Sequence, residues 1–154
     1  MHATKDNTSS LIADTIRRDQ HLGETMAFHA AFNQGIPPCP CESTNADKID
    51  LYAHKLMQEE LSELHDELED DNEVGVLDAL CDLQVILDGL WVQTGMHVVK
   101  QEAMMEVHES NMSKLGEDGK PIYREDGKIM KGPNYFKPDL KKILKEWRER
   151  NERT

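Results

Sequence analysis

Two long segments with helical spacing, separated by only three residues, constrain this chain more than any other feature. The first runs from about Ala46 to Glu69 and the second from about Glu73 to Thr94, with Asp70-Asp71-Asn72 between them. In the first segment apolar side chains recur every three or four residues, which is the spacing of a buried helix face; they are Met57, Leu61, Leu64 and Leu68. So short a connection predicts two antiparallel helices that pack together.

Acidic residues lie beside this apolar stripe on both predicted helices. Glu60 and Glu63 share a helix face because each residue turns by about 100°. Asp78 and Asp82, four residues apart, share a face of the next helix in the same way. Like charges at the edge of a helix seam repel one another and are costly to desolvate unless a cation collects them. A hard divalent cation fits oxygen ligands of this kind. The alternative is that an acidic chain simply carries solvated acidic faces.

This pattern resembles that of the all-α nucleoside triphosphate pyrophosphohydrolases, which include MazG, dimeric dUTPase and phosphoribosyl-ATP pyrophosphohydrolase. Their motif is E-E-x-x-E followed by E-x-x-D on the next helix. Glu59, Glu60 and Glu63 match the first half, and Asp82 matches the end of the second. The chain departs from the motif at Ala79, where the family has Glu. Asp78 can take that place, since spacings of three and four both lie on one helix face.

Two later segments strengthen the resemblance. Residues 110–114, Ser-Asn-Met-Ser-Lys, and residues 131–136, Lys-Gly-Pro-Asn-Tyr-Phe, look like a phosphoribosyl-ATP-pyrophosphohydrolase-like branch found in phage and bacteria. Together the matches cover about residues 28–139. The resemblance implies an all-α fold with a four-helix core of the MazG-like type, a short hairpin or loop, and a C-terminal helix. We expect one domain over residues 1–154, with its core at about 24–115 and an extension at 116–154.

The function implied by this resemblance is metal-dependent hydrolysis of (deoxy)nucleoside triphosphates to a nucleoside monophosphate and pyrophosphate. The expected cofactor is Mg²⁺, with Mn²⁺ as a substitute, because such an ion polarises phosphate and activates water. The expected metal ligands are Glu60, Glu63, Asp78 and Asp82. Glu59 and Glu60 are the expected catalytic residues, with Glu59 either binding an outer ion or orienting water as general base.

The same resemblance suggests four residues that contact the rest of the substrate. Lys114 and Lys131 are candidates to contact phosphate, and Asn111 and Asn134 to contact base, sugar or phosphate. Two other functions stay open at this point: hydrolysis of phosphoribosyl-ATP, and a catalytically silent helical regulatory module, which the departure at Ala79 keeps in view. The base and sugar preference does not follow from the sequence.

The amino-acid composition limits the fold class and the kinds of molecule that the chain can bind. A chain of 154 residues has room for one modest core, and the dominance of Leu, Met, Ala, Glu and Lys favours helices over sheet. The formal charge of −12 disfavours nucleic acid polymers and anionic membranes as partners. No apolar run approaches the ~20 residues of a membrane span, and no signal segment opens the chain. We expect a cytoplasmic protein, of a cell or of a virus-infected host, that self-associates to a dimer or tetramer.

Local patterns predict the remaining elements. We expect a frayed segment at residues 1–10 and helices at about residues 11–20, 24–33 and 98–114 and from 139 onward, with Gly23 breaking or bending the first of them. Phe28 and Phe32 have core spacing, and Cys81 is expected to be a small core residue. Asp118-Gly119 and Asp126-Gly127 are turn signals.

The segment before the long helices offers a helix cap and two cysteines. Thr44 is expected to cap the first long helix. Cys39-Pro40-Cys41 is expected to be an ordinary loop, because a structural zinc site needs about four ligands and nothing requires His29 or His54 to join. The three cysteines, an odd number, do not suggest a disulfide framework. No role follows for Cys39, Cys41 or Asp88.

Overall fold

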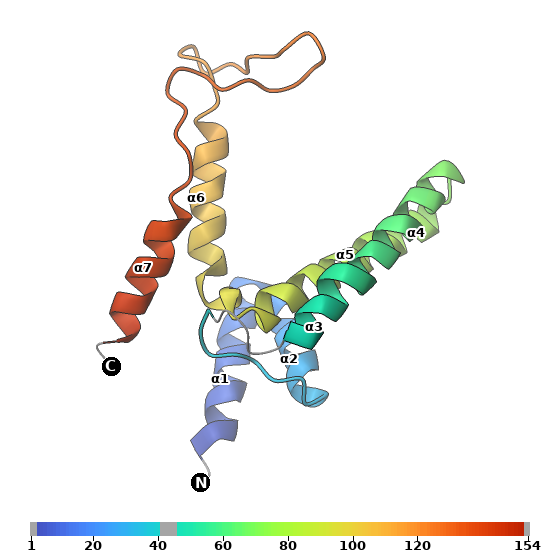
Figure 1. The fold of residues 1–154 in the computed structure, drawn as a ribbon, viewed down its shortest axis with the longest axis vertical. Coiled ribbons are helices and arrows are strands. Elements are labelled where there is room, and N and C mark those ends of the chain that lie inside the picture. The colour runs from blue at the N-terminus through green and yellow to red at the C-terminus, as the bar shows by residue number, and fades with distance from the viewer. Residues whose placement is uncertain (1–2, 41–45, 153–154) are drawn as a thin grey trace. The chain divides into compact units, whose positions relative to one another are not determined.

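The computed structural model describes residues 3–40 and 46–152, which form helices joined by turns without an assigned strand (Figure 1). The elements are α1 (Ala3–Arg18), α2 (Gln20–Ala31), α3 (Ala46–Asp50), the π-helical segment η1 (Leu51–Leu56), α4 (Met57–Glu69), α5 (Glu73–Gln93), the 3₁₀ turn η2 (Met96–Val99), α6 (Lys100–Met112) and α7 (Leu140–Asn151). The prediction of an all-α fold is confirmed. Within the described residues, no helix has the length and apolar character that a membrane crossing requires.

The chain folds as two compact units, one ending at Val98 and one beginning at Val99. In the first unit α1 already begins at Ala3, so the expectation of a frayed segment up to Ser10 was wrong. The prediction of a break at Gly23 was also wrong, because α2 begins at Gln20 and its N-cap is Asp19, which accepts a hydrogen bond from the backbone of Leu22. Gly23 instead allows close packing: a Cβ there would lie 2.6 Å from the backbone nitrogen of Ile16 in α1.

The core of the first unit lies where α2 meets α5. Leu22 and Met26 of α2 pack with Val92 of α5, and all three are buried. Phe28 and Phe32 were wrongly predicted as core residues, because the buried face of α2 is the one that carries Leu22 and Met26. They are 46% and 64% exposed and stack on each other with their ring centroids 4.4 Å apart.

The pair α4 and α5 forms a long antiparallel hairpin, as predicted (Figure 1). Asn72 caps α5 by accepting a hydrogen bond from the backbone of Gly75. No residue of α4 is buried, and Leu61 and Leu68 are 51% and 56% exposed. The apolar stripe predicted as core is therefore open within one chain, because α4 packs mainly on α5 and η1.

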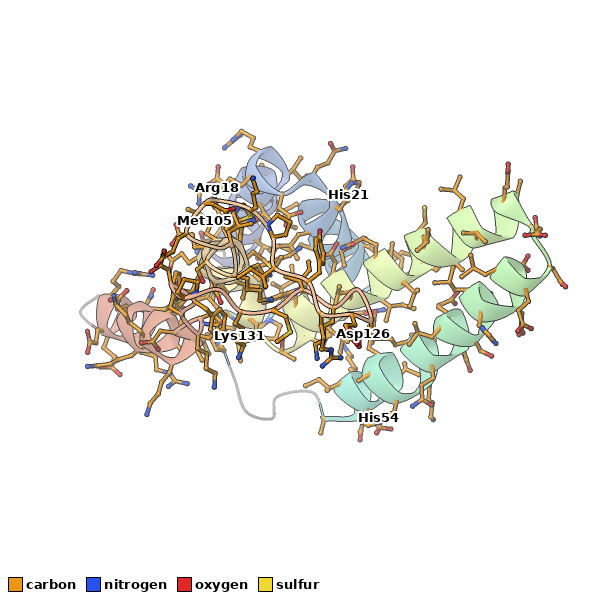
Figure 2. The ribbon with its side chains drawn as sticks, turned by 90° about the horizontal axis from the view of Figure 1, so that it is seen from above. Arg18, His21, His54, Met105, Asp126 and Lys131 are labelled. Atoms are coloured by element: carbon orange, nitrogen blue, oxygen red, sulfur yellow. The ribbon has the colours of Figure 1, made fainter. Side chains whose placement is uncertain are left out.

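The second unit consists of α6, α7 and the segment between them. Arg150 of α7 donates to both carboxylate oxygens of Glu102 in α6, at 3.0 and 3.1 Å. Both predicted turns are confirmed: Gly119 and Gly127 have φ of +73° and +82°, and an isolated antiparallel bridge joins Tyr123 to Ile129. Figure 2 labels Asp126, which opens the second turn. Cys41 and Thr44, for which a loop and an N-cap were predicted, lie outside the described residues.

Candidate active site

The register of α4 and η1 against α5 is set at both ends by glycine. A Cβ at Gly89 would overlap the ring of Tyr52, lying 2.9 Å from Cδ1, and a Cβ at Gly75 would overlap the carboxylate of Glu67. Since the two helices run antiparallel, these contacts place Glu60 level with Asp82 and Glu63 level with Asp78. The predicted acidic residues of the two helices therefore face each other across the line of contact between α4 and α5, which we call the seam. The seam carboxylates are Glu59, Glu60, Glu63, Asp78 and Asp82.

The π-helical segment η1 aligns Tyr52 with this seam. In an uninterrupted α-helix, Glu60 would lie about 80° round the axis from Tyr52. The wider π turn, in which the backbone N–H of Met57 bonds the carbonyl of Tyr52, removes most of that offset. The sequence predicted one continuous α-helix over 46–69, and this interruption was missed. As a result, Tyr52 and Glu60 both face α5.

Glu60 is the electrostatic centre of the seam. Partial burial between the helices raises the pKa of its carboxyl, and the charges of Glu63, Asp82, Asp78 and Glu59 raise that pKa further, in that order. Its Oε2 atom is buried and has no hydrogen-bond partner among the described residues. A buried carboxylate oxygen without a donor, surrounded by like charges, is an unfavourable arrangement in the absence of a cation.

The donor set fits a hard divalent cation. All five side chains are carboxylates, which are ligands that Mg²⁺ prefers, and the orphaned Oε2 of Glu60 is an oxygen that such an ion would satisfy. In the described part of the chain, no three His, Cys, Asp or Glu side chains are already arranged to hold an ion. The carboxylates are thus close enough to act on one another and have not converged.

At Ala79, where the family motif has Glu, the neighbouring Asp78 supplies a carboxylate. Ala79 is buried, whereas Asp78 is exposed and is one of the charges that raise the pKa of Glu60. Asp78 is therefore the acidic side chain of this turn that lies near enough to Glu60 to act on it. Its role as a metal ligand stays a prediction, as do those of Glu60, Glu63 and Asp82 and the catalytic role of Glu59, which is exposed at the rim.

The four candidate substrate residues all belong to the second unit. Lys114 Nζ donates to Asn111 Oδ1 at 2.7 Å, and the backbone N–H of Gly132 donates to the carbonyl of Lys114 at 2.9 Å. Lys131, labelled in Figure 2, lies 4.3 Å from the ring centroid of Tyr135. Three of the four thus gather at the end of α6, and the exposed Asn134 lies in the turn that follows Gly132.

Two serines hold this segment on α6. Ser110 Oγ donates to the carbonyl of Phe136 at 2.8 Å, and Ser113 Oγ accepts from the backbone N–H of the same residue. These contacts explain why the segments 110–114 and 131–136, which are distant in sequence, form one structural feature.

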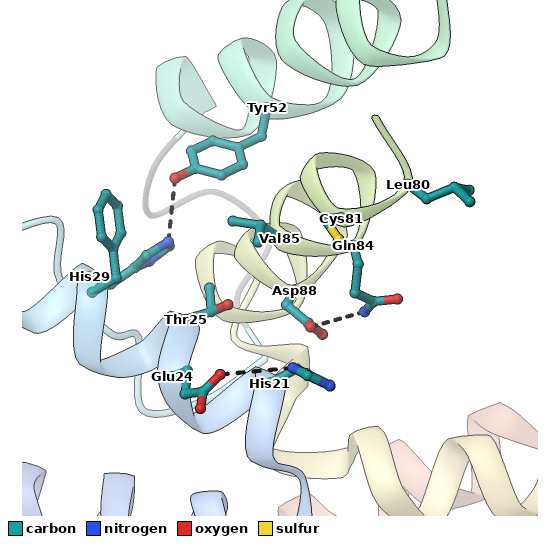
Figure 3. A pocket seen from close by; sticks show the side chains of 11 residues that line it. His21, Glu24, Thr25, His29, Tyr52, Leu80, Cys81, Gln84, Val85 and Asp88 are labelled. Carbon is teal, nitrogen blue, oxygen red and sulfur yellow. Dashed lines mark hydrogen bonds and ion pairs between the residues drawn. The ribbon is translucent and has the colours of Figure 1, made fainter. Parts of the chain in front are cut away.

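A cavity of about 470 Å³ lies in the first unit between α2, η1 and α5 (Figure 3). The buried side chain of His29 forms part of the cavity wall. Gln93 Nε2 donates to His29 Nδ1 at 2.8 Å, so the proton of the imidazole is on Nε2. This Nε2 atom lies 3.3 Å from the Tyr52 hydroxyl. Tyr52 in turn donates to Gln34 Oε1 at 3.1 Å. Burial lowers the pKa of His29, and the nearby charge of Lys48 lowers it further. The imidazole is therefore neutral, and both of its nitrogens are occupied.

Sequence reasoning missed this cavity and misplaced one of its residues. Cys81 was predicted to be a core residue, but it is exposed and lines the cavity. Asp88, which had no role, is fully buried and accepts a hydrogen bond from Gln84 Nε2 at 2.9 Å. The one available signal was His29 three residues after Met26 on the apolar face of α2, since a buried histidine needs polar partners.

The helical hairpin with carboxylates facing across its seam defines the class: an all-α nucleotide pyrophosphohydrolase of the MazG-like superfamily. The family model for phosphoribosyl-ATP pyrophosphohydrolase matches residues 25–111, more than half of the chain, and the chain belongs to that family. A comparison with curated proteins finds no match. The matched range includes all five seam carboxylates and ends at Asn111. Family membership indicates hydrolysis of a nucleotide at a pyrophosphate bond.

Proposed function

We propose that this protein hydrolyses (deoxy)nucleoside triphosphates between the α and β phosphorus atoms, with Mg²⁺ held by the seam carboxylates. The observation that carries the proposal is Glu60, whose buried, unpartnered Oε2 is surrounded by four further carboxylates. Glu60, Glu63, Asp78 and Asp82 would hold the metal, with Mn²⁺ as a substitute. The ion would supply Lewis-acid polarisation of the phosphates and lower the pKa of a bound water.

The remaining catalytic and binding roles fall to side chains of the protein. Glu59, exposed at the rim of the seam, accepts a proton from the attacking water. The water oxygen bonds to the α phosphorus, the bond from that phosphorus to the bridging oxygen breaks, and pyrophosphate leaves with the electron pair. We propose further that Lys114 and Lys131 contact phosphate, and that Asn111 and Asn134 contact base, sugar or phosphate.

Phosphoribosyl-ATP is the second candidate substrate, favoured by the family match over residues 25–111. It contains the same α–β bond, so the chemistry above applies to it without change. The two substrates differ in what is attached to the adenine base, and the seam carboxylates do not distinguish them.

A substrate panel tests this proposal. Pyrophosphate release is measured with dNTPs, NTPs and phosphoribosyl-ATP in Mg²⁺, in Mn²⁺ and in chelator. The expected result is metal-dependent release of one pyrophosphate per nucleoside monophosphate formed, fastest with a nucleoside triphosphate. Release that is fastest with phosphoribosyl-ATP selects the second candidate. No release from any of these substrates would mean that the chain is a catalytically silent helical module.

The proposal includes self-association through the open face of the α4–α5 hairpin. Leu61 and Leu68 of α4 and Val74 and Leu77 of α5 are all more than half exposed. Apolar residues concentrated on one hairpin favour a partner that covers them. We expect sedimentation to show a dimer or tetramer at micromolar concentration, and a monomer alone would contradict this.

A further inference from the structure

The cavity beside the seam carries an inference about the substrate. Its walls come from α2, η1 and α5, all within the first unit, and its volume of about 470 Å³ is in the range of small-molecule sites. It is lined largely by apolar and aromatic groups with a few polar atoms, among them Thr25 and Gln84. Such a lining suits a flat, neutral heterocycle.

The charges of the lining exclude phosphate. Among the eleven described residues that line the cavity, none is Lys or Arg, and two, Glu24 and Asp88, are carboxylates. His29 is neutral and both of its nitrogens are occupied, so it offers no positive charge. The second histidine of the lining, His21, has its Nδ1 atom 3.8 Å from the carboxylate of Glu24, which offsets any positive charge on that ring. A polyphosphate would be repelled there.

The cavity offers hydrogen-bond acceptors on two of its walls. The amide nitrogen of Gln84 donates to Asp88, which leaves the Gln84 carbonyl oxygen to accept. At the α2 side, Glu24 Oε1 accepts from Gln20 and Glu24 Oε2 lies 3.8 Å from His21 Nδ1 (Figure 3). Each carboxylate oxygen has a second lone pair with which to accept from a ligand. These acceptors complement the N–H groups of an exocyclic amine. Thymine and uracil instead present two carbonyl oxygens beside their one N–H, and those oxygens would face acceptors.

The cavity adjoins the acidic seam along α5. Cys81, which lines the cavity, is the neighbour of Asp82 and lies about 60° round the helix from Asp78. Phe28, 46% exposed, supplies an aromatic face at the α2 side. A nucleotide whose phosphates lie at the seam would thus have its base within reach of the cavity.

We infer that this cavity binds the base of the nucleotide and not its phosphates, and that it prefers bases with an exocyclic amino group to thymine or uracil. The inference rests on the proposed function, because it takes the seam carboxylates as the place where the phosphates are held. It names the substrate class as nucleotides of adenine, cytosine or guanine.

Cys81 provides a direct assay that needs neither metal nor catalysis. The wild-type protein is alkylated with iodoacetamide, and modification of Cys81 and Cys39 is followed separately by mass spectrometry. Deoxyadenosine, deoxycytidine, thymidine and inorganic tripolyphosphate are the probes. At a concentration about ten times Kd, deoxyadenosine and deoxycytidine should slow alkylation of Cys81 roughly tenfold by occupancy. Thymidine should need a several-fold higher concentration, tripolyphosphate should have no effect, and Cys39, which does not line the cavity, should react unchanged.

A filling variant locates the bound nucleoside. Val85→Trp places a large ring in the cavity, and Leu87→Trp puts the same ring on the same helix at a site that is 43% exposed and outside the cavity. Protection of Cys81 should vanish in Val85→Trp and persist in Leu87→Trp. Protection that survives in Val85→Trp would overturn the inference.

Three results with the wild-type protein would also overturn it: no protection by any nucleoside, equal protection by thymidine and deoxyadenosine, or protection by tripolyphosphate. The proposed function is tested apart from this, because the probes carry no bond to hydrolyse. If nucleosides protect Cys81 but no pyrophosphate is released, the base-binding site is supported and the proposed enzymatic activity is wrong.

Discussion

Neutralising Glu60 should stabilise the metal-free protein, which is the reverse of the usual effect of a substitution at a partly buried site. Partial burial raises the pKa of Glu60, and four neighbouring carboxylates raise it further. A like-charge pair three or four residues apart on a helix is unfavourable by about 0.2–0.5 kcal/mol. Glu63 forms such a pair with Glu60, and the other three carboxylates add to the repulsion. Glu60→Gln keeps the shape and removes this repulsion, so the free energy of unfolding should rise by about 0.5–1 kcal/mol. Urea denaturation in chelator measures this directly.

The pH dependence of the free energy of unfolding tests the repulsion at Glu60 independently. The folded pKa of Glu60 is raised above its ordinary value of 4.5, so the folded state holds its proton more tightly than the unfolded state. Glu60 therefore destabilises the protein at neutral pH, and this penalty disappears as the pH falls through the folded pKa toward 4.5. The stability gain of Glu60→Gln over wild type should accordingly shrink between pH 7 and pH 4.5.

Magnesium should reverse the order of stability. An ion held by the carboxylates stabilises wild type by linkage, and Glu60→Gln should gain less. Asp66→Asn is the control for like charge on the exposed helix surface, because Asp66 lies on the same helix and is not among the groups that raise the pKa of Glu60. The Asp66→Asn protein should gain as much stability from Mg²⁺ as wild type does. A Glu60→Gln protein that is less stable than wild type in chelator at pH 7, or a Glu60→Gln protein that gains as much from Mg²⁺ as the Asp66→Asn protein, would refute the reasoning.

Three further predictions concern the contacts around the site. Gly89→Ala should lower the free energy of unfolding by about 1–3 kcal/mol, because the new Cβ would overlap the ring of Tyr52; urea denaturation should show a smaller loss in a Tyr52→Ala background. Stability should fall as the pH drops below about 6.5, since burial lowers the folded pKa of His29 and the unfolded state then binds the proton first; His29→Gln should weaken this slope, and an unchanged slope would contradict it. Ser110→Ala removes the bond to Phe136, should cost about 1 kcal/mol, and should speed limited proteolysis between residues 113 and 139; cleavage at the wild-type rate would argue against that tether.

The helical hairpin was predictable because its signals are local. Apolar spacing, the short acidic turn and the i, i+3 and i, i+4 carboxylates each follow from helix geometry. The facing of Glu60 and Asp82 depends only on two antiparallel helices in one register. Asp78 was weighed as the residue in place of the Glu that Ala79 lacks, since helix geometry admits both spacings, and that role stays a prediction.

The parts that sequence reasoning missed depend on contacts between distant segments. The π turn at Leu51–Leu56 has no Gly or Pro to mark it, and it contains Tyr52, which packs against Gly89 of a distant segment. The cavity requires α2 to be placed against α5. The exposed Leu61 was assigned to a core because periodicity shows that a face is apolar without showing what covers it. In one chain, α4 has too few neighbours to bury that stripe.

The central claim is that the seam carboxylates hold the metal that drives hydrolysis, and turnover of conservative variants tests it most directly. Pyrophosphate release with Mg²⁺ is compared for wild type, Glu63→Gln, Asp82→Asn and Asp78→Asn, with circular dichroism to show that each variant remains helical. We expect the first two variants to lose activity by orders of magnitude while keeping their fold, and a large loss in Asp78→Asn to show that Asp78 replaces the Glu missing at Ala79. Full metal-dependent turnover in both Glu63→Gln and Asp82→Asn would mean that these carboxylates are solvated helix faces and that the account is wrong.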